Sequence, residues 1–208
     1  MKKAYQRLKE EYKKIGLSGY LYFIIRWQLV SFNKLEELIL KKGKILDFGC
    51  GRGILSNFLA LTSNQRQILG IDICQNKINQ AKIASQNIDN VIFTNQRIKE
   101  IEEKFDTIVM SDVLHHLPIE EQKEIIIKLR KKLTENGVLI IQDINKKSFP
   151  KYLVGWLIDV LFSGYKNIFY RSQEEIIAML KDSGFKVKIY GEDKIAHIIF
   201  IAHLDYVG

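Results

Sequence analysis

Between residues 43 and 145, short apolar runs alternate with stretches in which apolar residues recur every three or four positions. The first pattern predicts buried strands, and the second predicts helices that pack on one face. The predicted strands are residues 44–48, 67–71, 91–94, 105–110 and 137–142. The predicted helices are residues 54–61, 75–87, 98–102 and 119–133. Strands separated by helices form right-handed crossovers, so this α/β pattern predicts a parallel sheet with helices on both faces.

The two ends of the chain depart from this alternation. Residues 1–42 have helical spacing and predict an N-terminal helical cap. Residues 146–171 form an apolar insert, in which a helix is expected over 148–164. A chain of 208 residues is most simply one domain, so we expect a single domain built around a cofactor-binding core at residues 43–145.

The C-terminal segment, residues 172–208, combines a helix with a hairpin. The pattern predicts a helix and two strands, at residues 172–183, 185–190 and 195–202. The helix begins with a capping box between Ser172 and Glu175 and ends at Gly184. The link between the two strands is short, which predicts an antiparallel pair.

Composition and charge narrow the setting without identifying a function. The chain is 47% hydrophobic and 27% charged, which is ordinary for a globular protein with a core. Cys50 and Cys74 have neither zinc-ligand spacing nor a disulfide pattern, which predicts no metal site and a reducing, cytoplasmic location. The net charge of +8 favours nucleic acid, an anionic membrane or an acidic substrate, but the basic residues are spread along the chain. Lysines flank the apolar insert, so peripheral membrane contact through residues 146–163 stands beside packing on protein as an alternative.

Three glycines spaced two apart follow a short apolar strand that contains Asp47. They are Gly49, Gly51 and Gly53, and a helical pattern begins directly after them. Because glycine tolerates positive φ and has no side chain, such a loop can bring backbone N–H groups against a nucleotide-type ligand. The dinucleotide fingerprint is G-x-G-x-x-G, whereas this loop reads G-x-G-x-G. We therefore predict a nucleotide-type cofactor and note that the spacing departs from the dinucleotide form.

Asp72 is the second candidate site residue. It stands at the expected end of the second strand, 23 residues after Gly49. A carboxylate there can accept two hydrogen bonds from ribose hydroxyls, and Ile73 can lie against an adenine face. The alternative role for Asp72 is the N-cap of the following helix. Together with the glycine loop, Asp72 favours a cofactor that contains adenosine.

A third segment, residues 105–118, decides between cofactors. It reads Phe-Asp-x-Ile-Val and then Val-Leu-His-His-Leu-Pro. With the D-x-G-x-G-x-G loop and Asp72, it resembles the class I S-adenosylmethionine-dependent methyltransferases, most closely those acting on small molecules, including the quinone-biosynthesis type. The resemblance covers about residues 42–203. It implies a Rossmann-like sheet of seven mostly parallel strands with an antiparallel last strand, and S-adenosylmethionine as cofactor.

The resemblance also implies roles for individual residues. Asp47 orients the amino group of the cofactor, the glycine loop lines its methionine portion, and Asp72 holds the ribose. Asn95, or Gln96 in its place, meets the adenine amino group, and the residues that end the fourth strand face the methionine end. The expected cofactor-binding residues are Asp47, Gly49, Cys50, Gly51, Gly53, Asp72, Ile73, Asn95, Gln96, Ser111 and Asp112.

Methyl transfer from a sulfonium is an in-line displacement, so the protein chiefly aligns the acceptor, the methyl group and the sulfur. His115 and His116 are the candidates for a base that removes a proton from the acceptor, with a structural role as the alternative. The expected acceptor is a small, hydrophobic or aromatic molecule. The residues expected to line its site are Tyr22, Arg26, Trp156 and Tyr170.

Two other functions stay open. The basic charge leaves RNA as a methyl acceptor, although no RNA-binding module is visible. A fold does not fix a function, so a non-catalytic relative that only binds the cofactor is the other alternative. The sequence indicates neither the acceptor atom nor the oligomeric state.

Overall fold

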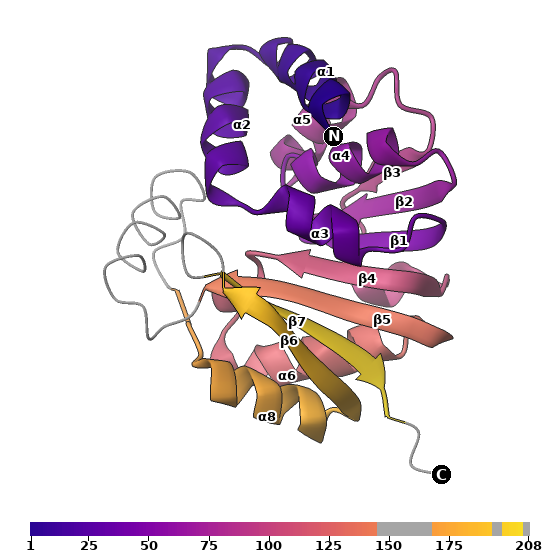
Figure 1. The fold of residues 1–208 in the computed structure, drawn as a ribbon, viewed down its shortest axis with the longest axis vertical. Helices are drawn as coiled ribbons and strands as arrows, with labels where there is room; N and C mark the ends of the chain where they lie inside the picture. Colours follow the sequence, from indigo (N-terminus) through magenta and orange to yellow (C-terminus); the bar gives the residue numbers. More distant parts are fainter. Residues whose placement is uncertain (145–167, 193–196, 206–208) are drawn as a thin grey trace. The chain divides into compact units, whose positions relative to one another are not determined.

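The computed structural model describes residues 1–144, 168–192 and 197–205, which form one mixed sheet and the helices around it (Figure 1). The sheet has seven strands in the order β3-β2-β1-β4-β5-β7-β6. The strands are β1 (Gly43–Phe48), β2 (Arg66–Ile71), β3 (Val91–Thr94), β4 (Phe105–Ser111), β5 (Leu133–Ile144), β6 (Phe185–Glu192) and β7 (His197–Leu204). The predicted fold class, a Rossmann-like α/β sheet that is mostly parallel and ends in antiparallel strands, is confirmed.

Helices precede the sheet and alternate with its strands. The α-helices are α1 (Lys2–Lys13), α2 (Leu17–Leu29), α3 (Phe32–Leu38), α4 (Ile54–Thr62), α5 (Gln75–Ala84), α6 (Ile119–Arg130) and α8 (Gln173–Asp182). Two short 3-10 helices are η1 (Ile98–Glu100) and η2 (Leu114–His116). No helix in the described part of the chain is both long and apolar enough to cross a membrane.

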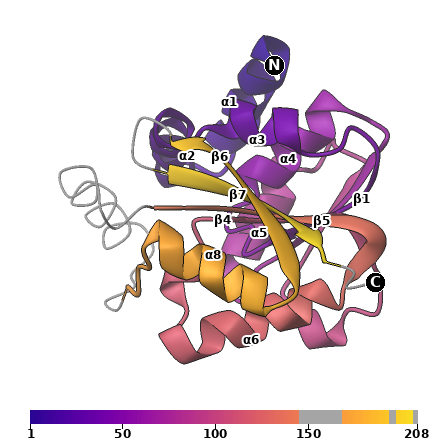
Figure 2. The ribbon, with the colours of Figure 1, turned by 60° about the horizontal axis from the view of Figure 1, so that its bottom comes forward.

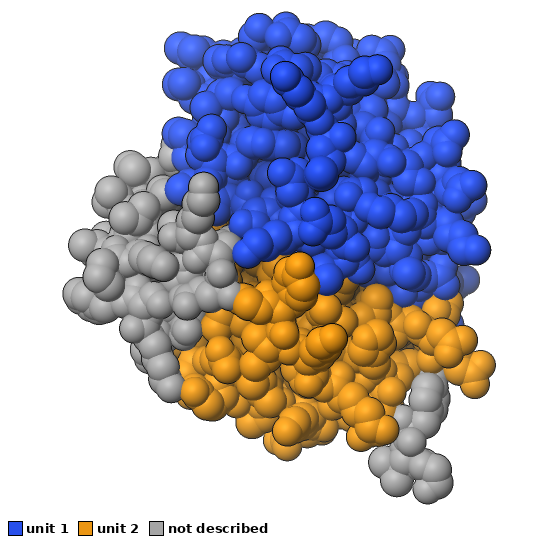
Figure 3. All heavy atoms as spheres, viewed as in Figure 1, with its two compact units in different colours: residues 1–107 blue, residues 108–208 orange. Residues whose placement is uncertain are grey.

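The chain divides into two compact units, residues 1–107 and 108–208 (Figure 3). In the first unit, β1 pairs in parallel with β2, and β2 with β3. The register sets Phe48 opposite Ile71, and Ile71 opposite Thr94. The carboxyl ends of these three strands therefore meet at one edge, where open α/β sheets bind their ligands.

Aromatic rings join the helices before the sheet to α4 within the first unit. Trp27 of α2 packs between Phe23 and Phe32, and its ring meets Phe58 of α4 edge-on, with 5.0 Å between centroids. Buried aromatic side chains contribute large apolar areas, and paired rings add about 0.5–1.5 kcal/mol. The N-terminal helical segment thus shares a core with α4.

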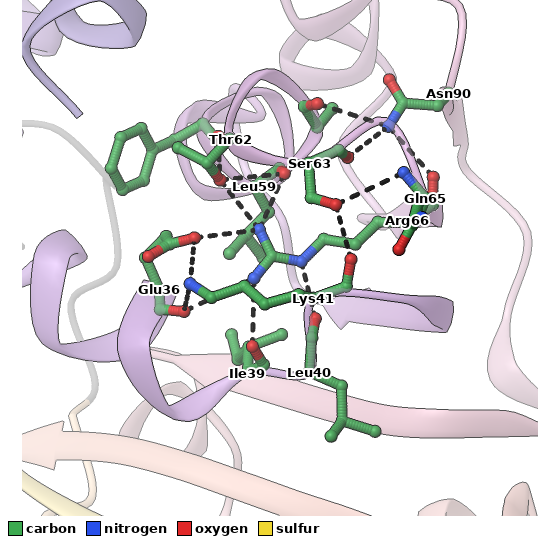
Figure 4. A network of polar contacts seen from close by, with 12 residues as sticks. Glu36, Ile39, Leu40, Lys41, Leu59, Thr62, Ser63, Gln65, Arg66 and Asn90 are labelled. Atoms are coloured by element: carbon green, nitrogen blue, oxygen red, sulfur yellow. Dashed lines mark hydrogen bonds and ion pairs between the residues drawn. The ribbon is translucent and has the colours of Figure 1, made fainter.

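A buried arginine holds α3 and α4 at their C-terminal ends (Figure 4). The Arg66 side chain has no exposed surface, and its guanidinium donates to the carbonyl oxygens of Leu40 and Leu59 at 2.7 and 2.9 Å. It also donates to Glu36 Oε1 at 3.3 Å, and Glu36 accepts a second bond from Lys41. The last carbonyls of a helix are without intrahelical donors and favour a cation, so Arg66 satisfies both helix ends at once.

The second unit contains the antiparallel strands and two helices that lie side by side (Figure 2). β7 pairs with β5 on one side and with β6 on the other, both antiparallel. Ser172 and Glu175 form the predicted capping box of α8, with hydrogen bonds of 3.3 and 2.6 Å. Gly184 follows the helix with a φ of 81°, as expected for its end.

Several predicted boundaries were wrong. The helix expected to run to residue 133 ends at Arg130, and β5 begins at Leu133, four residues earlier than predicted. α5 ends at Ala84 instead of residue 87. β6 continues past the expected turn to Glu192, after an irregularity in its pairing with β7. The helix expected over 148–164 lies outside the described residues, and the division at 43–145, 146–171 and 172–208 stays a prediction.

Candidate functional site

Asp47, near the end of β1, is buried under the first turns of α4. Its side chain is 2% exposed, and Oδ2 accepts a hydrogen bond of 2.5 Å from the hydroxyl of Ser56, which is itself fully buried. Burial raises the pKa of Asp47 to about 6, although the hydroxyl and backbone N–H of Ser56 act in the opposite direction and the charge of Asp72 raises it further. This carboxyl group is therefore protonated more readily than an ordinary aspartate.

The glycine loop that follows has left-handed backbone at every second residue. Gly49, Gly51 and Gly53 have φ values of 74°, 56° and 78°, a region that other residues rarely adopt. A Cβ atom on Gly53 would lie 2.7 Å from the ring of Phe93 and 2.9 Å from Ala81. The absence of a side chain at Gly53 therefore allows α4 to begin close to β3 and α5. Around Gly51, the described neighbour of such an atom is the hydroxyl of Tyr22, at 3.8 Å.

The backbone N–H groups of the loop are used inside the protein. Those of Gly49 and Cys50 both donate to the carbonyl oxygen of Ile71, at 2.8 and 2.9 Å. Gly53 donates to Cys50, and Gly51 donates to Asp72 Oδ2, both at 2.9 Å. These bonds join the loop to the end of β2 and fix its shape, and the expected contact of the loop with a ligand stays a prediction.

Asp72 joins the loop to the beginning of α5. Oδ2 accepts from Gly51 and Oδ1 accepts from the backbone N–H of Cys74, at 2.8 Å. The N-cap position of α5 is occupied by Cys74, so the alternative role of Asp72 as that N-cap was wrong. Ile73 beside it is 75% exposed, an unusual state for an isoleucine next to a buried strand.

The end of β3 lies next to the end of β2. The backbone N–H of Asp72 donates to the carbonyl oxygen of Thr94 at 3.3 Å, and Asn95 and Gln96 follow with exposed side chains. The structure thus brings five predicted cofactor residues of this unit to one edge, together with the loop: Asp47, Asp72, Ile73, Asn95 and Gln96.

In the second unit, the end of β4 carries Ser111 and Asp112. The hydroxyl of Ser111 donates to Gln142 Oε1 at 3.1 Å. Asp112 has a φ of 56°, a left-handed conformation that is uncommon outside glycine, and its Oδ1 lies 2.7 Å from Nε2 of His197. Both members of this acid–imidazole pair are buried, so Asp112 has a partner on β7 that the sequence did not indicate.

The two neighbouring histidines differ in environment. His115 is 1% exposed, and its Nδ1 lies 2.5 Å from Oδ1 of Asp143, whose other oxygen accepts from the backbone N–H of His115 at 3.2 Å. Tyr170 stacks on the His115 ring with 4.7 Å between centroids, whereas His116 is partly exposed. The sequence did not distinguish the two histidines, whereas the structure buries His115 against the carboxylate of Asp143.

The segment that carries Tyr170 is anchored on the same turn. The backbone N–H of Phe169 donates to the carbonyl oxygen of His115 at 2.7 Å. Gln122 donates to the carbonyl oxygens of Leu117 and Phe169, both at 3.0 Å. This network keeps Tyr170 against the imidazole of His115.

A sequence model of the methyltransferase domain family matches residues 28–188, about three quarters of the chain. This chain belongs to the methyltransferase domain family. The matched range includes the glycine loop, Asp72 and both histidines. The predicted membership of the class I S-adenosylmethionine-dependent methyltransferases is thereby confirmed, and with it the cofactor.

Individual relatives of this methyltransferase point the same way. It is 28% identical over 179 residues to the ubiquinone biosynthesis O-methyltransferase of Rickettsia canadensis, covering 81% of this chain and 71% of that protein. The corresponding protein of Rickettsia bellii is 28% identical over 148 residues, covering 66% of this chain and 58% of that protein. The chain therefore spans only part of these relatives.

A solved structure shares the fold. The magnesium protoporphyrin IX methyltransferase of Synechocystis, crystallised with bound SAH, has a TM-score of 0.66 and 24% identity to this methyltransferase, over 84% of this chain and 82% of that one. At this identity the likeness establishes the fold.

Some features of the methyltransferase were missed from its sequence. Ser56 and Asp143 gave weak signals, as a polar residue in an apolar helix and at the end of an apolar strand. Tyr12 gave none, because its hydroxyl donates to the carbonyl oxygen of Arg52, 40 residues away, at 2.6 Å. Of the residues expected to line an acceptor site, Tyr22 lies beside the glycine loop, Arg26 is one turn further along α2, and Trp156 lies outside the described residues.

Proposed function

We propose that this chain transfers the methyl group of S-adenosylmethionine to a hydroxyl group of a small, hydrophobic or aromatic molecule. The observation that carries the proposal is the position of Asp72. Its carboxylate is fixed by the backbone of Gly51 on one side and of Cys74 on the other, next to the exposed Ile73. A fixed carboxylate suits ribose hydroxyls, and an exposed isoleucine beside it suits an adenine face.

The backbone N–H groups of the glycine loop are bonded within the protein, which favours S-adenosylmethionine over a dinucleotide. A pyrophosphate needs several backbone donors, as helix N-termini and glycine-rich loops supply them. Here the N–H groups of Gly49, Cys50, Gly51 and Gly53 already have acceptors. S-adenosylmethionine carries no phosphate, so it needs fewer backbone donors than a pyrophosphate does.

Asp47 supplies charge for the amino group of the cofactor. With a pKa of about 6, the buried carboxyl group is readily ionised when an ammonium group lies beside it. We assign the methionine portion to Asp47 and the open side of the glycine loop, and the adenine to Ile73 with Asn95 or Gln96. Ser111 and Asp112 keep their predicted role at the methionine end.

When bound, S-adenosylmethionine supplies an electrophilic methyl group on a sulfonium sulfur. The contribution of the chain is to orient the acceptor and to take its proton. His116 is the better candidate for the base because it is partly exposed, whereas His115 is buried between Asp143 and Tyr170. We propose that His115 positions Tyr170, which lines the acceptor site.

The acceptor class rests on the names of the relatives, which are O-methyltransferases of ubiquinone biosynthesis. Such an acceptor is aromatic and carries hydroxyl groups. A direct assay distinguishes this acceptor class from methyl transfer to RNA and from no methyl transfer at all. The cytoplasmic location and membrane contact through residues 146–163 stay predictions.

Isothermal titration with S-adenosylmethionine tests the cofactor site. The wild-type chain should bind, Asp72→Asn should bind at least about tenfold more weakly, and the exposed Asp89→Asn should bind like wild type. Asp72→Asn keeps one carbonyl oxygen for the loop, so circular dichroism should show an intact fold. Unchanged affinity of the variant would refute the ribose assignment, and no binding by wild type would refute the proposal.

Transfer of a labelled methyl group tests the acceptor. Catechol, a hydroxylated benzoate with an apolar tail and total RNA serve as probes in parallel reactions. We expect label in the two phenolic compounds and a larger rate with the apolar tail. Label in RNA alone, or in none of the probes, would contradict the proposed acceptor class.

A further inference from the structure

The hydroxyl of Tyr22 lies beside the glycine loop, on the side where Gly51 is open. A Cβ atom built on Gly51 would meet this hydroxyl at 3.8 Å and no other described atom within 4 Å outside its chain neighbours. The N–H group of Gly51 is already bound to Asp72. The hydroxyl of Tyr22 in α2 therefore lies next to Gly51 at the glycine loop.

Arg52 holds the ring of Tyr22. The guanidinium carbon lies 4.2 Å from the centroid of that ring, well within the range of a cation–π contact. Nη1 of Arg52 also donates to the carbonyl oxygen of Ser18, one turn earlier in α2, at 3.3 Å. Arg52, which lies between two glycines of the loop, therefore contacts α2 at two points.

Tyr12 of α1 completes the attachment. Its side chain is fully buried, and its hydroxyl donates to the carbonyl oxygen of Arg52 at 2.6 Å. Burial raises the pKa of Tyr12 well above its usual value, so this hydroxyl stays protonated and remains a donor. The pair of helices α1 and α2 is therefore bound to the backbone and to the side chain of the loop.

We propose that Tyr22 contacts the methionine end of S-adenosylmethionine, with Arg52 and Tyr12 as positioning residues. This inference rests on the proposed function and replaces the expectation that Tyr22 lines the acceptor site. A phenol hydroxyl both donates and accepts, so it suits the carboxylate or the ammonium group of that end. Helices α1 and α2 then belong to the cofactor site.

Two probes of different length test the assignment. S-adenosylhomocysteine carries the amino-acid end, and 5′-methylthioadenosine lacks it but keeps the adenosine. Titration calorimetry should show that Tyr22→Phe binds the first probe about tenfold more weakly, because a hydrogen bond to a charged group is lost. Its affinity for 5′-methylthioadenosine should equal that of wild type. Tyr20→Phe, on the same helix beneath Lys13, is the matched control and should leave both affinities unchanged.

A double-mutant cycle tests the positioning role. Arg52→Gln should weaken S-adenosylhomocysteine in the wild-type background and have little further effect in the Tyr22→Phe background. Arg52→Lys, which keeps a cation over the ring, should restore most of the affinity.

Three results would overturn the inference. They are equal affinities of Tyr22→Phe and wild type for S-adenosylhomocysteine, equal losses for both probes, and additive effects of the Arg52 and Tyr22 substitutions. Failure of wild type to bind either probe would instead refute the proposed function.

Discussion

Replacing Asp47 by asparagine should stabilise the protein without ligand and impair its cofactor binding. The pKa of Asp47 is raised from 3.8 to about 6, chiefly by burial. At about 1.4 kcal/mol for each tenfold change, keeping this carboxyl group ionised above pH 7 costs about 3 kcal/mol. Asparagine removes the ionisation and retains an oxygen that can accept from Ser56.

The effect should depend on pH in a defined direction. Between about pH 4 and 6 the folded wild type binds more protons at Asp47 than the unfolded chain does, so stability falls as the pH rises through this window. Below it the carboxyl group is protonated in both states and the penalty vanishes. The advantage of Asp47→Asn should therefore be small near pH 4 and complete by pH 7.5.

Thermal unfolding of both proteins at pH 4.5, 6 and 7.5 measures this advantage. Allowing for the polarity of a buried amide, we expect Asp47→Asn to raise the free energy of unfolding by about 2 kcal/mol at pH 7.5. For a chain of this size, that raises the melting temperature by roughly 4–8 °C. Asp89→Asn, at an exposed site, should give no pH-dependent difference. A difference that is the same at all three pH values, or a variant that is less stable at pH 7.5, would refute the reasoning. The same variant should bind S-adenosylmethionine at least about tenfold more weakly.

Three further predictions concern stability. Gly53→Ala should lower the free energy of unfolding by more than about 2 kcal/mol in a thermal scan, because its new methyl group meets the ring of Phe93. Gly191→Ala, at a φ of 55° in open space, should lower it by only about 1 kcal/mol. Equal losses for the two variants would contradict this reasoning. Arg66→Met should lower the free energy of unfolding, measured by urea denaturation, by at least about 3 kcal/mol, since Glu36 and several helix carbonyls lose their donor. An unchanged urea midpoint would disprove the role of Arg66 in holding the helix ends. Asp143→Ala should lower the melting temperature by several degrees and Asp143→Asn by less, whereas equal losses would show that the bonds to its histidine partner contribute little.

The sequence predicted features that depend on local pattern. The apolar runs located all seven strands, and the glycine spacing located the turn before α4, because strand burial and positive φ are properties of short segments. The early start of β5 was missed because Leu133 is followed by three polar residues that look like a loop. No glycine or proline separates Arg130 from Leu133, so nothing marked the end of α6.

The candidate site was predicted only in part, for the same reason. Asp72 could be found from its place at the end of a strand, and Asp47 from the resemblance of the D-x-G-x-G-x-G loop to the methyltransferase motif. Other contacts of the site join segments that are far apart in the chain. They are the approach of Tyr22 to Gly51, the hydrogen bond from Tyr12 to the loop, and the pairing of Asp112 with His197. Such contacts follow from packing, which no local pattern contains.

The internally bonded glycine loop has a consequence for binding kinetics. Its N–H groups are satisfied before any ligand arrives, by Ile71, Asp72 and Cys50. Binding therefore requires little ordering of this part of the backbone, and the entropy of arranging the loop is part of the folding free energy. Association at the loop should be fast, and differences in affinity among adenosyl compounds should arise mainly from how quickly each one leaves.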